Sequence, residues 1–380
     1  PSEERMKSSN MYRFMQFING RYGKIFKEYG ELYQWSIDNI PDFWASMWEF
    51  ADIKTSKPYD QVVDDPGKMP GANWFPGARL NFAENLLRYR DNRTALIFKG
   101  ESRDSTRMTY AELYDEVSLV AAALKEAGVQ VGDRVAGFVP NMPQAIIAML
   151  AATSLGATWC SCSPDFGMKG VLDRFGQIKP KILFTANGYL FKGKNLDSLA
   201  RVSEIMAALP SIEKVVVVPY TEENPDISKV PNATGYREFI SGREPSEIIF
   251  EQLPADHPLY IMFTSGTTGL PKGVVLTHKN VMAELRSLDG AEPKYGYEED
   301  HVVGFLPLSH IFERVPVHFY IMYKGITKSY AESMETLLEA IAEKKPTIMF
   351  GVPRVHEKIY QKMLMTIREK PAVVQKLFAW

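Results

Sequence analysis

Between Thr94 and Val218 the chain alternates short apolar runs with longer amphipathic segments. The runs TALIFKG, DRVAGFVP, KILFTA and EKVVVVP have the length and the content of Val, Ile and Phe that are typical of strands. The segments between them carry apolar residues at helical spacing. Because strand, helix and strand succeed one another in units of about 30 residues, we expect an α/β fold whose parallel sheet is covered by helices on both faces.

Two helices of this region carry clear signals at their starts. Thr109 and Glu112 have the spacing of a capping box in front of AELYDEVSLVAAALKEAGV. Pro143 opens the next helix, which is apolar all round. The longest apolar run, residues 145–159, contains small residues and threonines and is too short for a bilayer core of about 30 Å, so it predicts a buried helix.

The regions on either side have a different character. The first 90 residues are rich in aromatic residues at mixed spacings of three and four, which predicts short helices packed on a larger body. After Pro258 the strand and helix pattern returns, with strands at 259–263, 301–310 and 346–351. We therefore expect three units, which are a helical N-terminal extension (1–90), a first α/β subdomain (91–256) and a second, truncated one that carries a polar loop (257–380).

Composition and charge narrow the possible partners. The 380 residues include 44 Lys and Arg against 46 Asp and Glu, a net charge of −2, which gives no reason to expect nucleic acid or anionic lipid as a partner. The start is polar and lacks an apolar core for export, so we expect a cytoplasmic protein without a transmembrane segment. Cys160 and Cys162 have no second Cys or His pair at metal spacing and are expected to be reduced, buried thiols.

The loop TSGTTGLPKG, at 264–273, directly follows a predicted strand. Its glycines allow close backbone approach, its hydroxyl and N–H groups are donors, and Lys272 adds a full positive charge, so the loop predicts a phosphate-binding site. The order of residues is neither that of a Walker loop nor that of the G-x-G-x-x-G dinucleotide fingerprint. The alternative is a flexible surface loop.

Here the residues resemble a known family. TSGTTGLPKG is similar to the phosphate-binding signature of the AMP-forming acyl-CoA synthetases, and LPLSHIFER, at 306–314, resembles a later core segment of the long-chain fatty acyl-CoA synthetases. YQWSIDNIPDFWASMWEF and NWFPGARLNFAENLL instead resemble acetoacetyl-CoA synthetase with its helical extension. Residues 10–250 thus look like one subfamily and residues 259–380 like another, with a seam near 250–258.

The resemblance implies a fold and a reaction. The fold is the partial N-terminal domain of an adenylate-forming enzyme, with parallel-rich sheets, and it lacks the family's C-terminal lid. In the reaction a carboxylic acid attacks ATP to give an acyl-adenylate and pyrophosphate, and the thiol of coenzyme A then displaces AMP. Such chemistry relies on positioning and on electrostatic stabilisation more than on a nucleophilic side chain.

The resemblance also implies roles for named residues. Thr264 would help to hold Mg²⁺, and His310 would approach the α-phosphate and the acyl carboxylate as a catalytic residue. Lys272 would be both catalytic and phosphate-binding. The residues that would wrap the β- and γ-phosphates are Ser265, Gly266, Thr267, Thr268, Gly269 and Lys272. The alternatives are a solvated lysine for Lys272 and a capped turn histidine for His310.

Other candidates near these motifs are expected to be structural. His278 matches a family position but is expected to hold the segment after the loop, not to touch ligand. Glu313 and Arg314 could form a local ion pair, and no catalytic role is assigned to them.

Two further groups have a functional and a structural interpretation. Lys192 and Lys194 are near the position where related enzymes meet the 3′-phosphate of coenzyme A, but two lysines in a loop are usually solvated. Trp35, Trp44 and Trp48 lie at helical spacing and are expected to be packing residues, not part of a pocket.

Three functions compete at this point. The first is an acyl-CoA synthetase for a fatty acid or acetoacetate, which as this fragment would bind triphosphate weakly and turn over little. The second is an adenylation domain that loads a carrier protein, and the third is a non-catalytic nucleotide-binding scaffold. Because sheet edges would be exposed in a partial domain, we also expect self-association.

Overall fold

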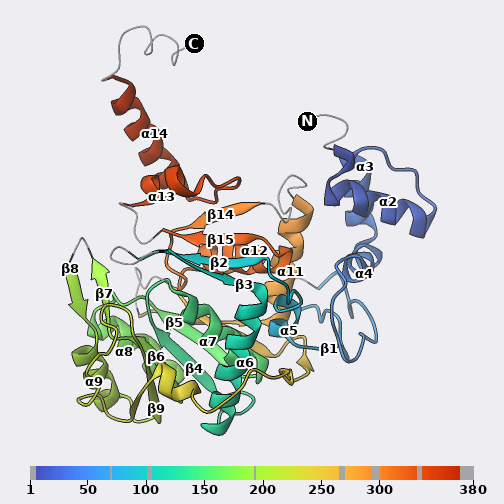
Figure 1. Ribbon diagram of the computed structural model, residues 1–380. Coiled ribbons are helices and arrows are strands. Elements are labelled where there is room, and N and C mark those ends of the chain that lie inside the picture. Colours follow the sequence, from blue (N-terminus) through green and yellow to red (C-terminus); the bar gives the residue numbers. More distant parts are fainter. Residues whose placement is uncertain are drawn as a thin grey trace.

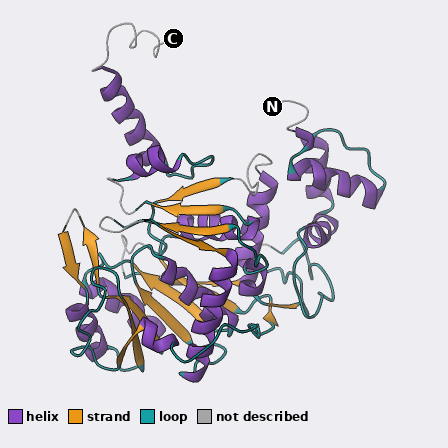
Figure 2. Ribbon diagram, viewed as in Figure 1, coloured by secondary structure: helices purple, strands orange, loops and turns teal. Residues whose placement is uncertain are grey.

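A computed structural model of the chain supports the predicted fold class. It describes residues 6–68, 71–100, 105–191, 194–264, 270–291, 300–331 and 336–368. Two sheets form the body, and helices pack around and between them (Figures 1 and 2). The predicted α/β architecture with parallel-rich sheets and a helical extension is confirmed.

The larger sheet has seven strands in the order β10-β9-β6-β4-β5-β12-β13. Its strands are β4 (Arg134–Phe138), β5 (Thr158–Cys162), β6 (Ile182–Ala186), β9 (Lys214–Val218), β10 (Ala233–Gly235), β12 (Pro258–Phe263) and β13 (Gly273–Thr277). All neighbours are parallel except β13, which runs antiparallel to β12 and forms one edge. Gly137 on β4 leaves room for the indole of Trp159 on β5, because a Cβ there would lie 2.7 Å from the Trp159 ring.

The smaller sheet has four strands in the order β14-β15-β2-β3. Its strands are β2 (Thr94–Phe98), β3 (Thr106–Thr109), β14 (His301–Gly304) and β15 (Thr327–Tyr330). β14, β15 and β2 are parallel, and β3 is antiparallel to β2. Both sheets therefore contain strands from either side of residue 256, and the division of the chain at that residue stays a prediction.

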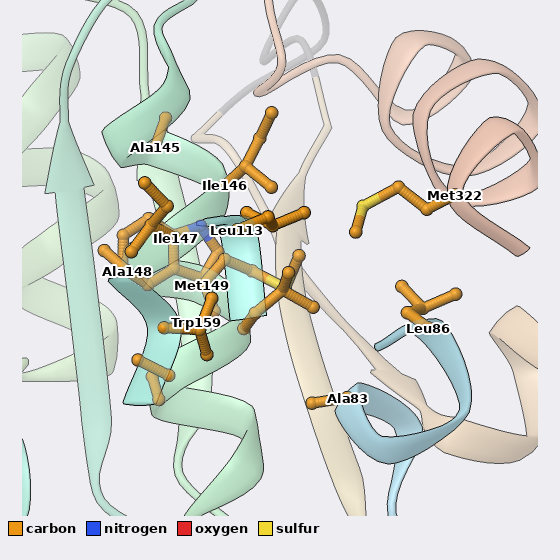
Figure 3. Packing of buried hydrophobic residues seen from close by; sticks show 14 of the residues in the cluster. Ala83, Leu86, Leu113, Ala145, Ile146, Ile147, Ala148, Met149, Trp159 and Met322 are labelled. Atoms are coloured by element: carbon orange, nitrogen blue, oxygen red, sulfur yellow. The ribbon is translucent and has the colours of Figure 1, made fainter. Parts of the chain in front are cut away.

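The first core cluster lies where α7 packs against its neighbours. α6 (Tyr110–Glu126) begins with the predicted capping box, since the Thr109 hydroxyl accepts the N–H of Glu112 and the Glu112 carboxylate accepts the N–H of Thr109. α7 (Pro143–Ser154) is buried on all sides from Ala145 onward, as the apolar run predicted. Figure 3 shows its side chains facing Trp159 on one side and α5 and Met322 on another.

The remaining elements connect and cover the sheets. The helices are α5 (Phe82–Leu86), α8 (Met168–Ile178), α9 (Leu199–Ala208), α10 (Tyr236–Ile240), α11 (His278–Ala291), the π-helix η1 (Glu313–Phe319), α12 (Tyr320–Lys324), α13 (Leu337–Lys344) and α14 (Pro353–Arg368). The short strands are β1 (Arg79–Leu80), β7 (Gly188–Phe191), β8 (Lys194–Asp197) and β11 (Leu253–Pro254).

The N-terminal helices form a small core of their own beside α11 (Figure 1). They are α2 (Asn10–Tyr22), α3 (Tyr29–Asp38) and α4 (Ile40–Phe50). Trp35 is buried in their centre and lies 5.0 Å from the ring of Tyr22, as centroids are measured. The packing role predicted for Trp35 is thus confirmed.

Two of the predicted strands are shorter in the structure than the sequence suggested. β14 ends at Gly304, because the following residues turn to place backbone groups against Asn141 instead of continuing the ladder. The strand predicted at 346–351 is reduced to a single bridge between Val302 and Ile348. Pairing within a sheet is decided by the neighbouring strand, which apolar content alone does not reveal.

Candidate functional site

The TSGTTGLPKG loop is the connection of the hairpin formed by β12 and β13. Its base is closed by two hydrogen bonds, in which the N–H of Thr264 donates to the Lys272 carbonyl (3.1 Å) and the N–H of Lys272 donates to the Thr264 hydroxyl (3.0 Å). Gln177 on α8 donates to the Pro271 carbonyl at 2.8 Å. The two ends of the loop are therefore fixed, while Ser265, Gly266, Thr267, Thr268 and Gly269 lie outside the described residues.

The position of this loop suits a ligand. β12 is parallel to β5, so the loop leaves the sheet at the carboxyl end of its parallel strands, which is where open α/β sheets bind their ligands. The side chains of Thr264 and Lys272 are both exposed to solvent. A phosphate at this edge would meet the side chain of Lys272 without any need to displace core residues.

His310 lies in a turn after β14 and is exposed. Its Nδ1 accepts the N–H of Phe312 at 3.2 Å, and its carbonyl accepts the N–H of Arg314 at 3.0 Å. The ring is thus held at the start of a helix through one nitrogen. No described residue forms a hydrogen bond with its other nitrogen, Nε2, which could therefore bind a ligand.

Asn141 connects the His310 turn to the larger sheet, and the sequence analysis missed it. The side-chain amide donates to the Leu306 carbonyl at 2.7 Å and accepts the N–H of Leu308 at 2.8 Å. Because Asn141 follows β4, it fixes the His310 turn at the same carboxyl edge of the sheet from which the TSGTTGLPKG loop emerges. The only sequence signal was an Asn two residues before the proline that opens α7.

Glu313 and Arg314 do not form the local ion pair that their sequence positions allowed. The buried carboxylate of Glu313 instead accepts a hydrogen bond from Lys328 on β15, at 2.5 Å. The two residues point in different directions because they are neighbours in a helix. Burial lowers the pKa of Lys328, and the Glu313 carboxylate partly restores it.

Arg314 instead supports the His310 turn from the other side. Its Nε donates to the Leu308 carbonyl at 2.9 Å, and its guanidinium lies over the ring of Tyr260, 5.2 Å from the centroid. Burial raises the pKa of the Tyr260 hydroxyl, and the positive charge of Arg314 opposes that rise. The residue is fully buried and so belongs to the scaffold of the site.

His278 has the structural role that was expected. It is buried at the start of α11, and its Nδ1 accepts the N–H of Phe82 at 3.1 Å. Burial lowers its pKa to about 3, with a smaller effect from His257. At neutral pH the imidazole is therefore uncharged and carries its proton on Nε2.

The remaining candidates are two cysteines and two lysines. Cys160 and Cys162 are buried free thiols, as predicted, and burial raises the pKa of Cys162 to about 12. Lys194 is exposed on β8, and Lys192 lies outside the described residues. Within the described ranges no group of three or more His, Cys, Asp or Glu side chains could hold a metal ion. None of the helices described there is long and apolar enough to cross a membrane.

Two family profiles match the chain. Residues 82–376 match the AMP-binding enzyme profile, and residues 29–86 match the acetyl-coenzyme A synthetase N-terminus profile. The second match covers the helices α3, α4 and α5 and the segment between α4 and α5.

Individual relatives agree with these profiles. An acetoacetyl-CoA synthetase of Macaca fascicularis is 44% identical over 277 residues, which are 71% of this chain and 41% of the relative. A malonamoyl-CoA synthetase of Penicillium aethiopicum is 40% identical over 71% of this chain and 39% of its own length. The solved acetoacetyl-CoA synthetase of Streptomyces lividans superposes with a TM-score of 0.82 at 33% identity, covering 92% of this chain and 54% of that structure. The chain thus spans about two fifths of the length of these curated relatives.

Proposed function

Because the chain belongs to the AMP-binding enzyme family, we propose that it forms the nucleotide- and acid-binding part of an AMP-forming acid–thiol ligase. In that reaction a carboxylate oxygen attacks the α-phosphate of ATP and pyrophosphate leaves. The thiol of coenzyme A then attacks the acyl carbon of the acyl-adenylate, and AMP leaves. Both steps develop charge on phosphate or carbonyl oxygens, so positioned donors are the main requirement.

The observation that carries the proposal is the closed base of the TSGTTGLPKG hairpin. The paired hydrogen bonds between Thr264 and Lys272 hold both ends of the loop at the carboxyl edge of the sheet. Lys272 and the donors of Ser265 to Gly269 would bind the β- and γ-phosphates. His310, held at the same edge through Asn141, would approach the α-phosphate and the acid.

The metal and the thiol substrate are part of the same proposal. Thr264 uses its hydroxyl oxygen to accept the Lys272 N–H and keeps a second lone pair, which fits a Mg²⁺ ion that accompanies the triphosphate. The ion would neutralise charge on the phosphate oxygens. Coenzyme A would be the acceptor, as in the name of each relative, and nothing observed favours a carrier protein.

For the acid we propose a short chain with a carbonyl at the β position. The named relatives act on acetoacetate and malonamate, which share that group. The resemblance of 306–314 to long-chain synthetases would favour a fatty acid instead. A short acid and a fatty acid bury very different amounts of apolar area. The size of the acyl pocket would therefore select one of the two.

The nucleotide site can be tested directly by equilibrium dialysis of the chain with radiolabelled ATP and Mg²⁺. We expect Lys272→Ala to weaken binding at least tenfold, because one charge-assisted contact to phosphate contributes about 1.5–3 kcal/mol. Lys24→Ala, which removes an exposed lysine in the N-terminal helical region, is the matched control and should leave binding unchanged. Equal affinities for all three proteins would overturn the phosphate site.

The acid is tested by exchange of labelled pyrophosphate into ATP. Acetoacetate, malonamate, butyrate and palmitate would be compared at equal concentration. We expect exchange, however slow, to be stimulated by the first two acids more than by butyrate. Stimulation by palmitate alone would refute the proposal of a short β-carbonyl acid as substrate, but it would still support the ligase reaction.

A further inference from the structure

A pocket of about 330 Å³ lies between the N-terminal extension and α11, and its lining includes neither Thr264 nor Lys272. Trp44 and Trp48 of α4 and Trp74 of the following segment form its aromatic wall. Leu80, Met282 and Ala283 also line the pocket. Trp44 and Trp48 have the packing role that was expected, since both pack against a core cluster. They also line this pocket, which was not expected, because the segment after α4 brings Trp74 beside Trp44.

The aromatic wall is built by contacts among its own members. The rings of Trp44 and Trp74 meet edge to face at 6.0 Å, and Trp48 packs on Phe75 at 4.6 Å. These contacts fix the orientation of the indole rings. The rings stay partly accessible, since Trp44, Trp48 and Trp74 are half-buried. A prearranged wall costs a ligand little ordering entropy on binding.

The pocket also presents hydrogen-bond donors. His278 lines it, is almost completely buried, and uses Nδ1 to accept the Phe82 N–H, which leaves Nε2–H without a partner among the described residues. Asn280 uses its carbonyl oxygen to accept the N–H and the hydroxyl of Thr277, which leaves its NH₂ group as a donor. The Nε2–H of His278 and the NH₂ group of Asn280 are therefore donors that an oxygen of a ligand in the pocket can accept.

Charge and size define the class of ligand. The lining consists of aromatic and aliphatic residues with His278 and Asn280 and includes no Asp, Glu, Lys or Arg of the described chain, so a fully charged ligand would lose hydration without compensation. An apolar cavity of about 150 Å³ holds one benzene ring. A pocket of 330 Å³ therefore accommodates two fused rings or a chain of similar volume.

We propose that this pocket is a second ligand site, which binds a neutral, flat, mostly apolar molecule with one carbonyl-type acceptor that faces His278 and Asn280. The site joins the N-terminal extension to the start of α11, so the bound molecule would fasten the two together. It is independent of the nucleotide site, and its test uses no nucleotide.

The test compares two probes of nearly equal shape, 2-acetylnaphthalene and 2-ethylnaphthalene, by equilibrium dialysis against the whole chain. We expect the acetyl compound to bind with a Kd on the order of 0.1 mM, given ordinary ligand efficiency. It should bind about fivefold more tightly than the ethyl compound, because only its carbonyl can accept the spare N–H. Equal affinity of the two probes would overturn the assignment of His278 and Asn280 as donors.

A variant on α11 tests the location without disturbing the buried histidine. Ala283→Leu fills the pocket and is expected to abolish binding of both probes, whereas Ala208→Leu, at the exposed end of α9, should leave it unchanged. In chain labelled with ¹⁵N-histidine, the Nε2 resonance of His278 should move on addition of the acetyl probe only. Binding that survives Ala283→Leu, or a His278 resonance that does not respond, would overturn the site.

Discussion

Single buried groups set the response of this protein to acid. His278 accepts a backbone N–H inside the body, and burial lowers its pKa to about 3, against 6.5 for a solvent-exposed histidine. The folded protein therefore holds His278 neutral where the unfolded chain would take up a proton. This difference stabilises the fold fully above pH 6.5, and the stabilisation is lost as the pH falls from 6.5 towards 3.

We expect the His278 contribution to fall by about 2 kcal/mol between pH 7 and pH 5, since each pH unit below 6.5 costs about 1.4 kcal/mol. The free energy of unfolding would be measured in urea at both pH values. His278→Asn keeps an acceptor for Phe82 but cannot be protonated, so its pH dependence should be smaller by that amount. His356→Asn, at an exposed position, should retain the full wild-type loss.

The comparison between variants separates the pH-dependent contribution of His278 from that of the other buried histidine. His318 is also buried, and burial holds its pKa well below 6.5, so it contributes a loss of the same sign to every variant. If His278→Asn and the wild type lost equal stability between the two pH values, the buried neutral histidine would be refuted.

At the scale of elements, η1 is attached to the smaller sheet by one buried ion pair. Glu313 at the start of η1 and Lys328 on β15 are only 2% and 1% exposed. Gly304 on β14 makes room for them, because a Cβ there would lie 2.5 Å from the Lys328 Cε and would also clash with the Glu313 carboxylate. A small residue on one strand thus permits an ionic contact between a helix and the next strand.

Removal of one partner should cost more than removal of both. We expect Glu313→Gln to lower the free energy of unfolding by about 3 kcal/mol, because it leaves the Lys328 ammonium buried without a counter-charge. The double variant E313L/K328M should recover most of that loss. Urea denaturation of the single and double variants checks this, and a double variant less stable than either single one would contradict it.

An exposed pair of the same charge type provides the matched control. Lys99 and Glu343 lie 2.6 Å apart with both side chains 46% exposed. Because water solvates each ion when its partner is removed, Lys99→Met and Glu343→Gln should change stability little, alone or together.

At the scale of the whole molecule, β13 forms one edge of the larger sheet among the described strands. β13 pairs only with β12 in the described sheet, and Val274 and Val275 are 46% and 50% exposed. An edge strand with exposed β-branched apolar residues is a template for a strand of another chain. Self-association, expected from the sequence, therefore has a specific candidate surface.

We expect the chain to associate as its concentration rises, as measured by sedimentation velocity. Val275→Lys should shift the distribution towards monomer, since charge on an edge strand opposes pairing. Val131→Lys, at a valine that is 48% exposed and outside any strand, should leave the distribution unchanged. A monodisperse monomer at all concentrations would contradict the prediction.

The sequence by itself determined those features whose cause is local. The α/β alternation, the capping box at Thr109, the start of α7 at Pro143 and the buried thiols follow from propensity and periodicity over a few residues. The family could also be recognised from the sequence, because its signature TSGTTGLPKG is a run of ten contiguous residues. The roles of Thr264, Lys272 and His310 stay predictions that rest on that resemblance.

Only the tertiary structure decided which distant residues meet. It gave Glu313 the partner Lys328 in place of its neighbour Arg314, and it brought Asn141 to the turn that carries His310. It also brought Trp44 and Trp74 into contact, so that together they line one pocket. Such contacts depend on how strands order themselves and where loops end, and periodicity along the chain carries no information about these long-range pairings.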